Sequence, residues 1–220
     1  MSFLVRVVLP DTPGSLGKLA AAFGSVGVNI ESVDAVEQSL DGTVTDDIVV
    51  TLPPGVLPDT IFSAALQLPG VDIDSIRPFS GRVDRRGQII LLAAVAEERT
   101  SHAKAMQRLV DTLPQSMTSG WAIVLRNDDV MRRVAASSAA PEDDGSAPAH
   151  VDIDAARILQ PDTESWIPER WTLLDASLCI APIGKTGLLL VIGRPGGPDF
   201  LASEVEHIGS LCTIVGSMLQ

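Results

Sequence analysis

The nucleophilic, acidic and metal-ligating side chains of this sequence do not fall into the spacings that known catalytic sites require. No serine lies in the Gly-x-Ser-x-Gly turn of a hydrolase, and no glycine-rich segment has the spacing of a phosphate-binding loop. The histidines His102, His150 and His207 have no second histidine or cysteine at metal-ligand spacing. We therefore expect a protein that is not an enzyme and that carries no metal and no cofactor.

Four acidic pairs could in principle serve acid–base chemistry, but they fall in predicted turns or strand edges, where solvated surface is the expected role. These pairs are Asp46-Asp47, Glu97-Glu98, Asp128-Asp129 and Asp143-Asp144.

The overall charge limits the class of partner. The chain has 220 residues, with 16 basic and 28 acidic side chains and a net charge of −12. Nucleic-acid binding needs several lysines or arginines placed on phosphates, so we expect none here. The start of the chain lacks the pattern of a signal peptide, and no apolar run is long enough to span a membrane. Together with two cysteines, Cys179 and Cys212, expected to be reduced core residues, this predicts a cytoplasmic protein without membrane contact.

A polar turn near the start of the chain is the clearest local signal. Asp11, Thr12, Pro13 and Gly14 follow an alternating apolar run and precede a helical pattern. Proline fixes φ in such a turn, and glycine lets the backbone approach closely. Asp11 or Thr12 could cap the helix that follows. The segment therefore predicts a strand-to-helix turn.

The first 80 residues alternate between strand and helix patterns. Apolar residues recur at every second position in the strands and at three- and four-residue spacing in the helices. Gly27 ends the first helix pattern, and the alternation slips by one residue near Glu31, which predicts a β-bulge. The expected strands are 3–9, 28–35, 44–52 and 71–79, and the expected helices are 15–26 and 58–68. This β-α-β-β-α-β order predicts a ferredoxin-like fold within an α+β protein.

The second half has a different pattern. Two segments have helical periodicity, and Pro114 is expected to end the second of them. Two β-hairpins are followed by a long C-terminal helix, whose apolar stripe fits either a core alone or a core plus a dimer interface. The expected helices are 84–97, 99–113 and 202–219, and the expected strand pairs are 121–126 with 130–136 and 176–183 with 187–193. Residues 155–171 are expected to form a helix and a packed loop, and 137–150 a flexible acidic loop.

Two segments of the first half resemble the ACT domain family, which occurs in regulated enzymes of amino-acid metabolism. The first is the run from Leu9 to Leu16, with its Asp-Thr-Pro-Gly turn, and the second is Gly27-Val28-Asn29-Ile30. The resemblance implies that two copies pair through their sheets and bind a small effector, usually an amino acid, at the shared interface. The ligand-binding residues that it implies are Asp11, Thr12, Pro13, Gly14, Asn29 and Ile30.

The second half is similar, at the level of pattern, to a GAF-like domain. The best-matching part runs from Leu178 through the apolar run 187–193 to Phe200 and the last helix. The expected organisation is an ACT-like domain at 1–81, a linker helix at 82–98 and a GAF-like α/β sandwich with an antiparallel sheet at 99–220.

Two functions compete on these observations. One is a homodimeric regulator that senses an amino acid through its first domain and relays the signal to a protein partner through its second. The other is a dimerisation module whose ligand site is lost, because Leu9 is apolar where some amino-acid-binding members carry a polar side chain.

Overall fold

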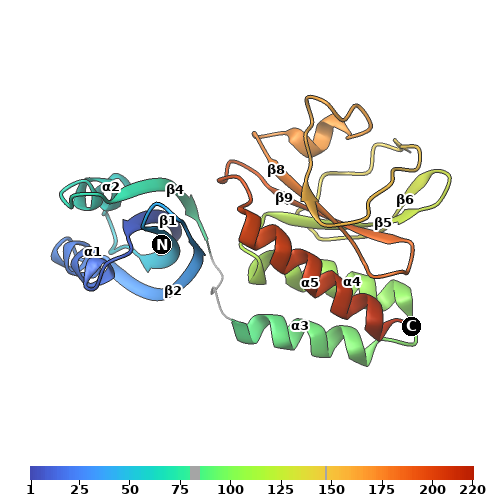
Figure 1. Cartoon of the computed structure of the whole chain (residues 1–220), viewed down its shortest axis with the longest axis horizontal. Coiled ribbons are helices and arrows are strands. Elements are labelled where there is room, and N and C mark those ends of the chain that lie inside the picture. Colours follow the sequence, from blue (N-terminus) through green and yellow to red (C-terminus); the bar gives the residue numbers. More distant parts are fainter. Residues whose placement is uncertain (80–84, 147) are drawn as a thin grey trace. The chain divides into compact units, whose positions relative to one another are not determined.

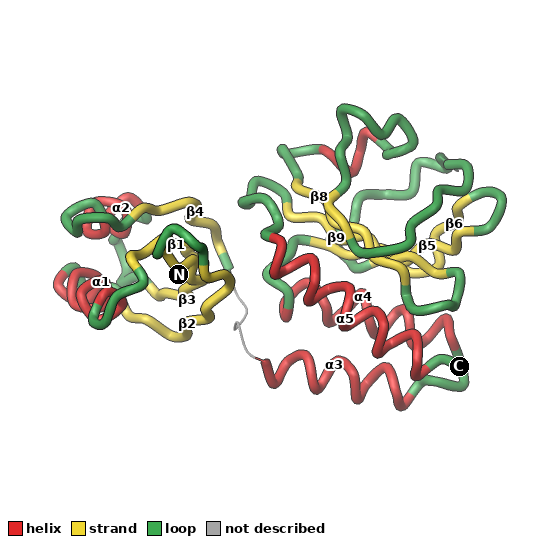
Figure 2. The backbone as a smooth tube through the Cα atoms, viewed as in Figure 1, coloured by secondary structure: helices red, strands yellow, loops and turns green. Residues whose placement is uncertain are grey.

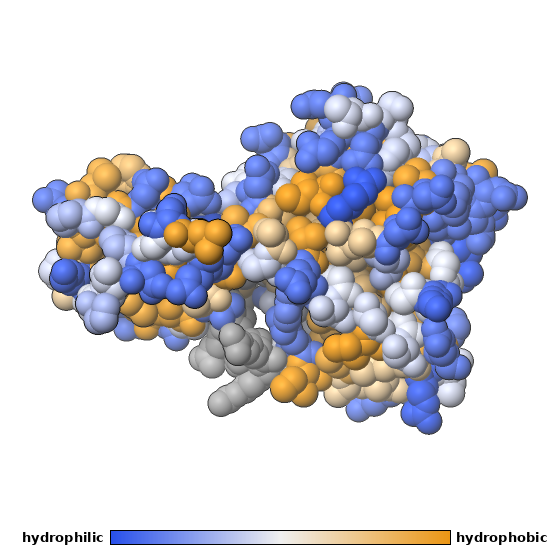
Figure 3. Space-filling model, viewed as in Figure 1, coloured by the Kyte–Doolittle hydropathy of each residue, from blue (hydrophilic) through white to orange (hydrophobic). Residues whose placement is uncertain are grey.

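The computed structural model describes residues 1–79, 85–146 and 148–220, which form two compact units, 1–84 and 85–220. Each unit has its own antiparallel sheet and its own buried apolar core (Figure 1). The visible surface of each unit mixes hydrophilic and hydrophobic side chains (Figure 3). In the part of the chain that the structure describes, no helix combines the length and apolar character needed to cross a bilayer.

The first unit has the element order expected from the sequence. Its sheet has the strand order β2-β3-β1-β4, and both helices lie on one face of it (Figure 2). Its elements are β1 (Ser2–Pro10), α1 (Ser15–Ser25), β2 (Asn29–Gln38), β3 (Thr43–Thr51), α2 (Asp59–Ala65) and β4 (Asp72–Pro78). Every second residue of β1, from Phe3 to Leu9, enters the core with Leu19 and Phe23 of α1. The apolar residues at every second position of the strand therefore pack against the apolar face of the helix in one core layer.

Local backbone signals in the first unit are also confirmed. Gly27 has φ +79°, the left-handed conformation in which glycine ends helices. The pairing of β2 with β3 shifts register between Ile30 and Ser32, at the predicted bulge, and again between Ala35 and Glu37. These bulges lie on an edge strand of the sheet, where irregular pairing is common.

The second unit places three helices on one face of a five-stranded sheet and long loops on the other (Figure 1). The strand order is β6-β5-β9-β8-β7. The strands are β5 (Trp121–Asn127), β6 (Met131–Ala136), β7 (Arg157–Ile158), β8 (Ser177–Pro182) and β9 (Leu188–Arg194), and the helices are α3 (Arg85–Glu97), α4 (His102–Ser116) and α5 (Ala202–Met218). Both predicted hairpins are present, with the expected partners.

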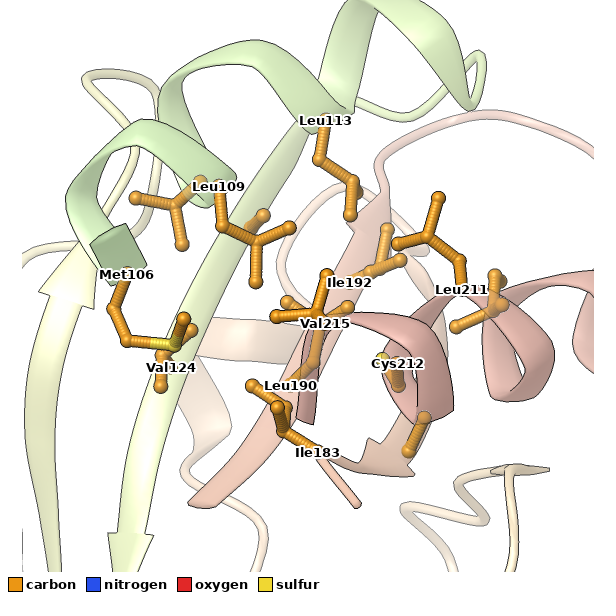
Figure 4. Close-up of a cluster of buried hydrophobic side chains, with 14 of the residues drawn as sticks. Met106, Leu109, Leu113, Val124, Ile183, Leu190, Ile192, Leu211, Cys212 and Val215 are labelled. Carbon is orange, nitrogen blue, oxygen red and sulfur yellow. The ribbon is translucent and has the colours of Figure 1, made fainter. Parts of the chain in front are cut away.

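The core between this sheet and its helices is tightly filled with apolar side chains. Met106, Leu109 and Leu113 of α4 meet Leu190 of β9 and Val215 of α5 in its centre (Figure 4). Buried residues of α5 line one face of the helix, whereas Ile214 on another face is 45% exposed. Helix α5 thus contributes to this core, and one apolar side chain remains outside it.

Several expectations for the second unit are wrong. The helix expected over 82–98 is not a linker between domains, because the described part of α3 packs into the second core through Leu91 and Val95. Residues 82–84 lie outside the described residues. Pro114 does not end α4, which continues to Ser116. A proline lacks only its own backbone N–H, and the helix closes beyond it because the amide of Met117 donates to Leu113 at 2.9 Å.

Two expectations for the long loops are also wrong. Residues 155–165 do not form a helix; they contain the short strand β7 and then turns, followed by the 3₁₀ helix η1 (Glu169–Thr172). Residues 137–150, expected to have nothing to bury, begin with Ser137, which is 9% exposed. Its hydroxyl accepts a hydrogen bond from the amide of Ala122 at 3.0 Å. The segment also forms a β-bridge between Ala149 and Val130.

Candidate functional site

The Asp-Thr-Pro-Gly turn lies between β1 and α1, at the end of the first sheet, and all four of its residues are exposed. Gly14 has φ +90°, a left-handed conformation that strongly favours glycine. It occupies the N-cap position, and no side chain caps the helix. The hydroxyl of Thr12 contacts that of Ser15 at 2.8 Å instead. The expectation that Asp11 or Thr12 caps α1 is therefore wrong.

Asp11 is held in place from two sides. Its backbone amide donates to the carbonyl of Gly42 at 2.8 Å, which ties the turn to the β2–β3 hairpin. Its carboxylate accepts a hydrogen bond from the side-chain amide of Gln38, the last residue of β2. Because β3 lies between β1 and β2, this bond fixes the carboxylate across the end of the sheet. Gln38 could not be predicted from spacing, since a residue 27 positions away reaches Asp11 only through the strand order.

Three of the amides at the start of the helix that follows this turn have no backbone acceptor in the described chain. Ser15 donates to Thr12 and Lys18 to Gly14, whereas Gly14, Leu16 and Gly17 make no backbone hydrogen bond of this kind within the described chain. Such amides, together with the partial positive charge of a helix N-terminus, favour an anionic group. The turn therefore carries the Asp11 carboxylate and, a few residues further along the chain, N–H donors.

Asn29 and Ile30 lie at the other end of the same sheet. Asn29 is opposite Thr51 of β3, whereas Pro10, next to Asp11, is opposite Thr43. These positions on β3 are eight residues apart, which corresponds to roughly 26 Å along a strand. Asn29 is exposed, and Ile30 packs partly into the core. Within one chain, the two predicted segments are thus not brought together.

The electrostatics near Asp11 are strongly negative. Asp46 of β3 is only 5% exposed, and burial raises the pKa of its carboxyl. The neighbouring carboxylates, including Asp11, raise that pKa further. Asp47 is also buried and pairs with Arg6, whose Nε lies 2.8 Å from Oδ1. The expectation that this acidic pair is solvated surface is therefore wrong.

The two cysteines, expected to be reduced core residues, both lie in the second unit. Cys179 of β8 and Cys212 of α5 are both buried. Burial raises the pKa of the Cys179 thiol to about 12 and raises that of Cys212 as well. A thiol with such a pKa has little thiolate at neutral pH, so both cysteines act as core residues. Among the described residues, no group of His, Cys, Asp and Glu side chains has the arrangement of a metal site.

The loop face of the second sheet carries an aromatic cluster that the sequence did not predict. The ring centroid of Trp171 in η1 lies 6.2 Å from that of Trp121 in β5 and 6.3 Å from that of Trp166. Glu164 anchors this loop, because its carboxylate accepts two hydrogen bonds from Arg157, at 2.8 and 2.6 Å. The loop between β7 and β8 is therefore a packed element of the second unit.

Comparisons with known proteins give structural similarity only. No protein-family model matches the chain, and no curated protein matches it in sequence. Among solved structures, the GAF domain of an Acinetobacter phosphoenolpyruvate-protein phosphotransferase is 14% identical, covers 62% of this chain and 94% of its own, and has a TM-score of 0.46.

Two further structures are similar to the same extent. The GAF domain of A. Aeolicus nlh2 is 11% identical, with 63% and 95% covered and a TM-score of 0.43. The free methionine-R-sulfoxide reductase from Neisseria meningitidis is 9% identical, with 64% and 95% covered and a TM-score of 0.46. The similar structures thus include GAF domains, the family that the second half of the sequence resembles. At these identities and TM-scores, none of them assigns a function to this chain.

Proposed function

We propose that this protein is a non-catalytic regulator whose first unit binds an amino acid, or a similar small zwitterion, between two copies of the chain. The observation that carries the proposal is the exposed turn between β1 and α1, which combines the Asp11 carboxylate, held by Gln38, with amides at the start of α1 that have no backbone acceptor in the described chain. A carboxylate beside N–H donors is complementary to an ammonium group beside a carboxylate. The second unit would transmit the bound state to a protein partner.

The second copy supplies what one chain lacks. Strand β2 is an edge strand, so its outer backbone groups are free to pair with another strand. If β2 pairs antiparallel along its full length with β2 of a second copy about a two-fold axis, Gln38 of one copy lies opposite Asn29 of the other. Asn29, which is roughly 26 Å from Asp11 within one chain, then reaches the Asp11 turn of the second copy.

This pairing also suits the charges of β2. In the register that places Gln38 opposite Asn29, each acidic residue of the strand faces an uncharged residue of the other copy, so no like charges lie directly opposite one another. The facing pairs are Glu31 with Val36, Asp34 with Val33 and Glu37 with Ile30.

Thermal unfolding in the presence of each of the twenty amino acids tests the proposal. A ligand at about one hundred times its Kd adds about 2.7 kcal/mol to the stability of the state that binds it. We expect one or a few amino acids to raise the melting temperature, and Asp11→Asn or Asn29→Ala to abolish that rise. Asp74→Asn, an exposed acidic residue on the opposite edge strand β4, is the matched control and should retain it. No rise with any amino acid at millimolar concentration contradicts amino-acid sensing.

A dimerisation module without a ligand is the second candidate. Two observations favour it: Leu9 is 1% exposed and belongs to the core, and the Asp11 carboxylate already has a partner in Gln38. In that case the chain should be dimeric by light scattering, no amino acid should shift its melting, and Asp11→Asn should change neither result. Val33→Arg, at an exposed residue midway along β2, should then separate the copies.

A further inference from the structure

A small cavity lies on the loop face of the second sheet. Residues 142–146, which follow β6 and are called the acidic segment below, line one side of it. Its volume is about 20 Å³, room for about one water molecule. Leu125, Met131 and Trp171 form its apolar wall, and all three belong to the core on this face of the sheet. Its rim carries two arginines, Arg133 and Arg170. An apolar wall with two cations at its rim is complementary to an organic anion.

The two arginines reach the cavity from different elements. Arg133 of β6 pairs with Leu125 of β5 in the sheet register, so both side chains lie on the loop face. Its guanidinium donates to the carbonyl of Pro141 at 2.8 Å. Arg170 comes from η1, next to Trp171. A guanidinium can donate to two oxygens of one carboxylate, sulfonate or phosphate, and arginine is the residue best suited to such groups.

The acidic segment occupies this rim with weak contacts. Arg170 lies 3.7 Å from a carboxylate oxygen of Glu142 and 4.0 Å from one of Asp144. The side chains are 51% exposed for Arg170 and 92% for Glu142. Ion pairs this long and this exposed contribute little to stability. The contacts place carboxylates at the arginine of the rim, yet they can be broken at small cost.

The segment keeps its own turn structure through local hydrogen bonds. The amide of Gly145 donates to Asp143 at 3.1 Å, and the amide of Ser146 donates to Asp144 at 2.9 Å. On either side of this turn, Pro141 and Pro148 are tied to β6 through the Arg133 side chain and the Met131 amide. The bonds of the turn itself do not involve the sheet, so residues 142–146 can move away from the cavity between these two ties. A cavity with room for about one water molecule would then open to a larger molecule.

We propose that this cavity binds a small organic anion, with its charged group on Arg133 and Arg170 and its apolar body against Trp171, and that Glu142 and Asp144 take the place of the anion when none is bound. The acidic segment and the ligand compete for the same arginines. Binding therefore depends on the charge of the ligand. An anion must displace the carboxylates of the acidic segment and overcome the net charge of −12, so weakly binding anions are excluded. This site is independent of the function proposed for the first unit.

The aromatic sulfonate 8-anilinonaphthalene-1-sulfonate is a suitable probe, because it combines an anionic group with an apolar ring system. Its fluorescence titration with the full chain measures Kd. Replacing the acidic segment with amides, in Glu142→Gln/Asp143→Asn/Asp144→Asn, should tighten binding by about tenfold, which corresponds to about 1.4 kcal/mol. Adding Arg170→Gln to that variant should reverse the gain. Arg170 is half exposed, so this change should leave the fold intact.

A matched control separates local competition from the general effect of charge. Glu97→Gln/Asp128→Asn/Asp129→Asn removes the same number of exposed acidic side chains at sites outside the cavity. The proposal requires this variant to bind the probe as the unmodified chain does. Equal tightening in both triple variants overturns it, and so does a Kd that Arg170→Gln leaves unchanged. Urea midpoints of all variants should agree, because the probe also binds partly unfolded chains.

Discussion

The hydrogen bonds of Glu164 make a quantitative prediction about stability in acid. Besides its two bonds from Arg157, the Glu164 carboxylate accepts the backbone amide of Gln160 at 2.7 Å and the indole N–H of Trp166 at 3.1 Å. All four bonds favour the ionised carboxylate. Glu164→Gln keeps the shape of the side chain but removes its charge, so it measures what the charge contributes to the second unit.

The size of the effect follows from the pKa of this carboxyl. The bonds from Arg157, and then those from Gln160 and Trp166, lower the pKa of Glu164 from 4.5 to about 2. At 1.36 kcal/mol per pKa unit, this sets a ceiling of about 3 kcal/mol. The Arg157 side chain is 39% exposed, so solvent screening reduces the expected contribution to about 1–2 kcal/mol.

The pH range of the effect is fixed by the direction of the shift. Because the folded pKa is below the unfolded one, the contribution is fully present above about pH 4.5 and is lost as the pH falls toward 2. Urea unfolding followed by tryptophan fluorescence, at several pH values between 2 and 7, gives the free energy of unfolding. All three tryptophans lie in the cluster on this face, so the signal reports this unit. The difference between the unmodified chain and Glu164→Gln should shrink across this range.

Glu169→Gln is the matched control, since Glu169 is exposed in the same loop. It should leave the free energy of unfolding unchanged at every pH. A difference for Glu164→Gln that stays constant from pH 7 to pH 2 would refute the reasoning, because a constant loss reflects packing and not ionisation.

Three further predictions concern the cores and the buried charges. Leu109→Ala, in the centre of the second core, should cost about 2–5 kcal/mol of unfolding free energy in urea unfolding. Arg194→Met breaks the 2.6 Å ion pair with Glu204 at a side chain that is 0% exposed, and it should cost about 3–5 kcal/mol in the same assay. Asp46→Asn should raise the urea midpoint of the first unit, followed by far-UV circular dichroism, at pH 7 and leave it unchanged near pH 3. Burial raises the folded pKa of that carboxyl above its unfolded value of 3.8, so the unmodified chain loses stability as the pH rises from that unfolded value to the folded pKa.

The sequence predicted the elements whose patterns are local. The first unit has the expected strands, helices and bulge, because each follows from the spacing of apolar residues within ten or so positions. The terminal helix and both hairpins of the second unit were predicted for the same reason. For the segment between β7 and β8, the packed loop was predicted but its structure was not, since the loop is held by Glu164 and by contacts among tryptophans up to 50 positions apart. No local period encodes such contacts.

The candidate site residues, too, were predicted only where their signal is local in sequence. The Asp11 turn was found because its residue types demand a turn, and the structure places it at the end of β1. The partner of its carboxylate, Gln38, depends on the strand order of the sheet and could not be read from spacing. The separation of Asp11 from Asn29 likewise follows from the parallel direction of β1 and β2, which both pair antiparallel with β3. Residues that a family resemblance assigns to one binding site can therefore lie far apart within one chain.

The Glu164 interactions and the proposed anion cavity belong to one loop, so they should influence each other. Glu164 holds Trp166, whose ring packs at 90° against Trp171, and Trp171 forms part of the cavity wall. Loss of the Glu164 charge weakens the hydrogen bond from the indole N–H, and with it the support of that wall. An organic anion that binds the wall would then also order the loop, and part of its binding energy would be used for that ordering. Glu164→Gln should therefore weaken binding of the aromatic sulfonate at neutral pH, even though it removes a negative charge from the protein. Charge repulsion alone predicts the opposite sign.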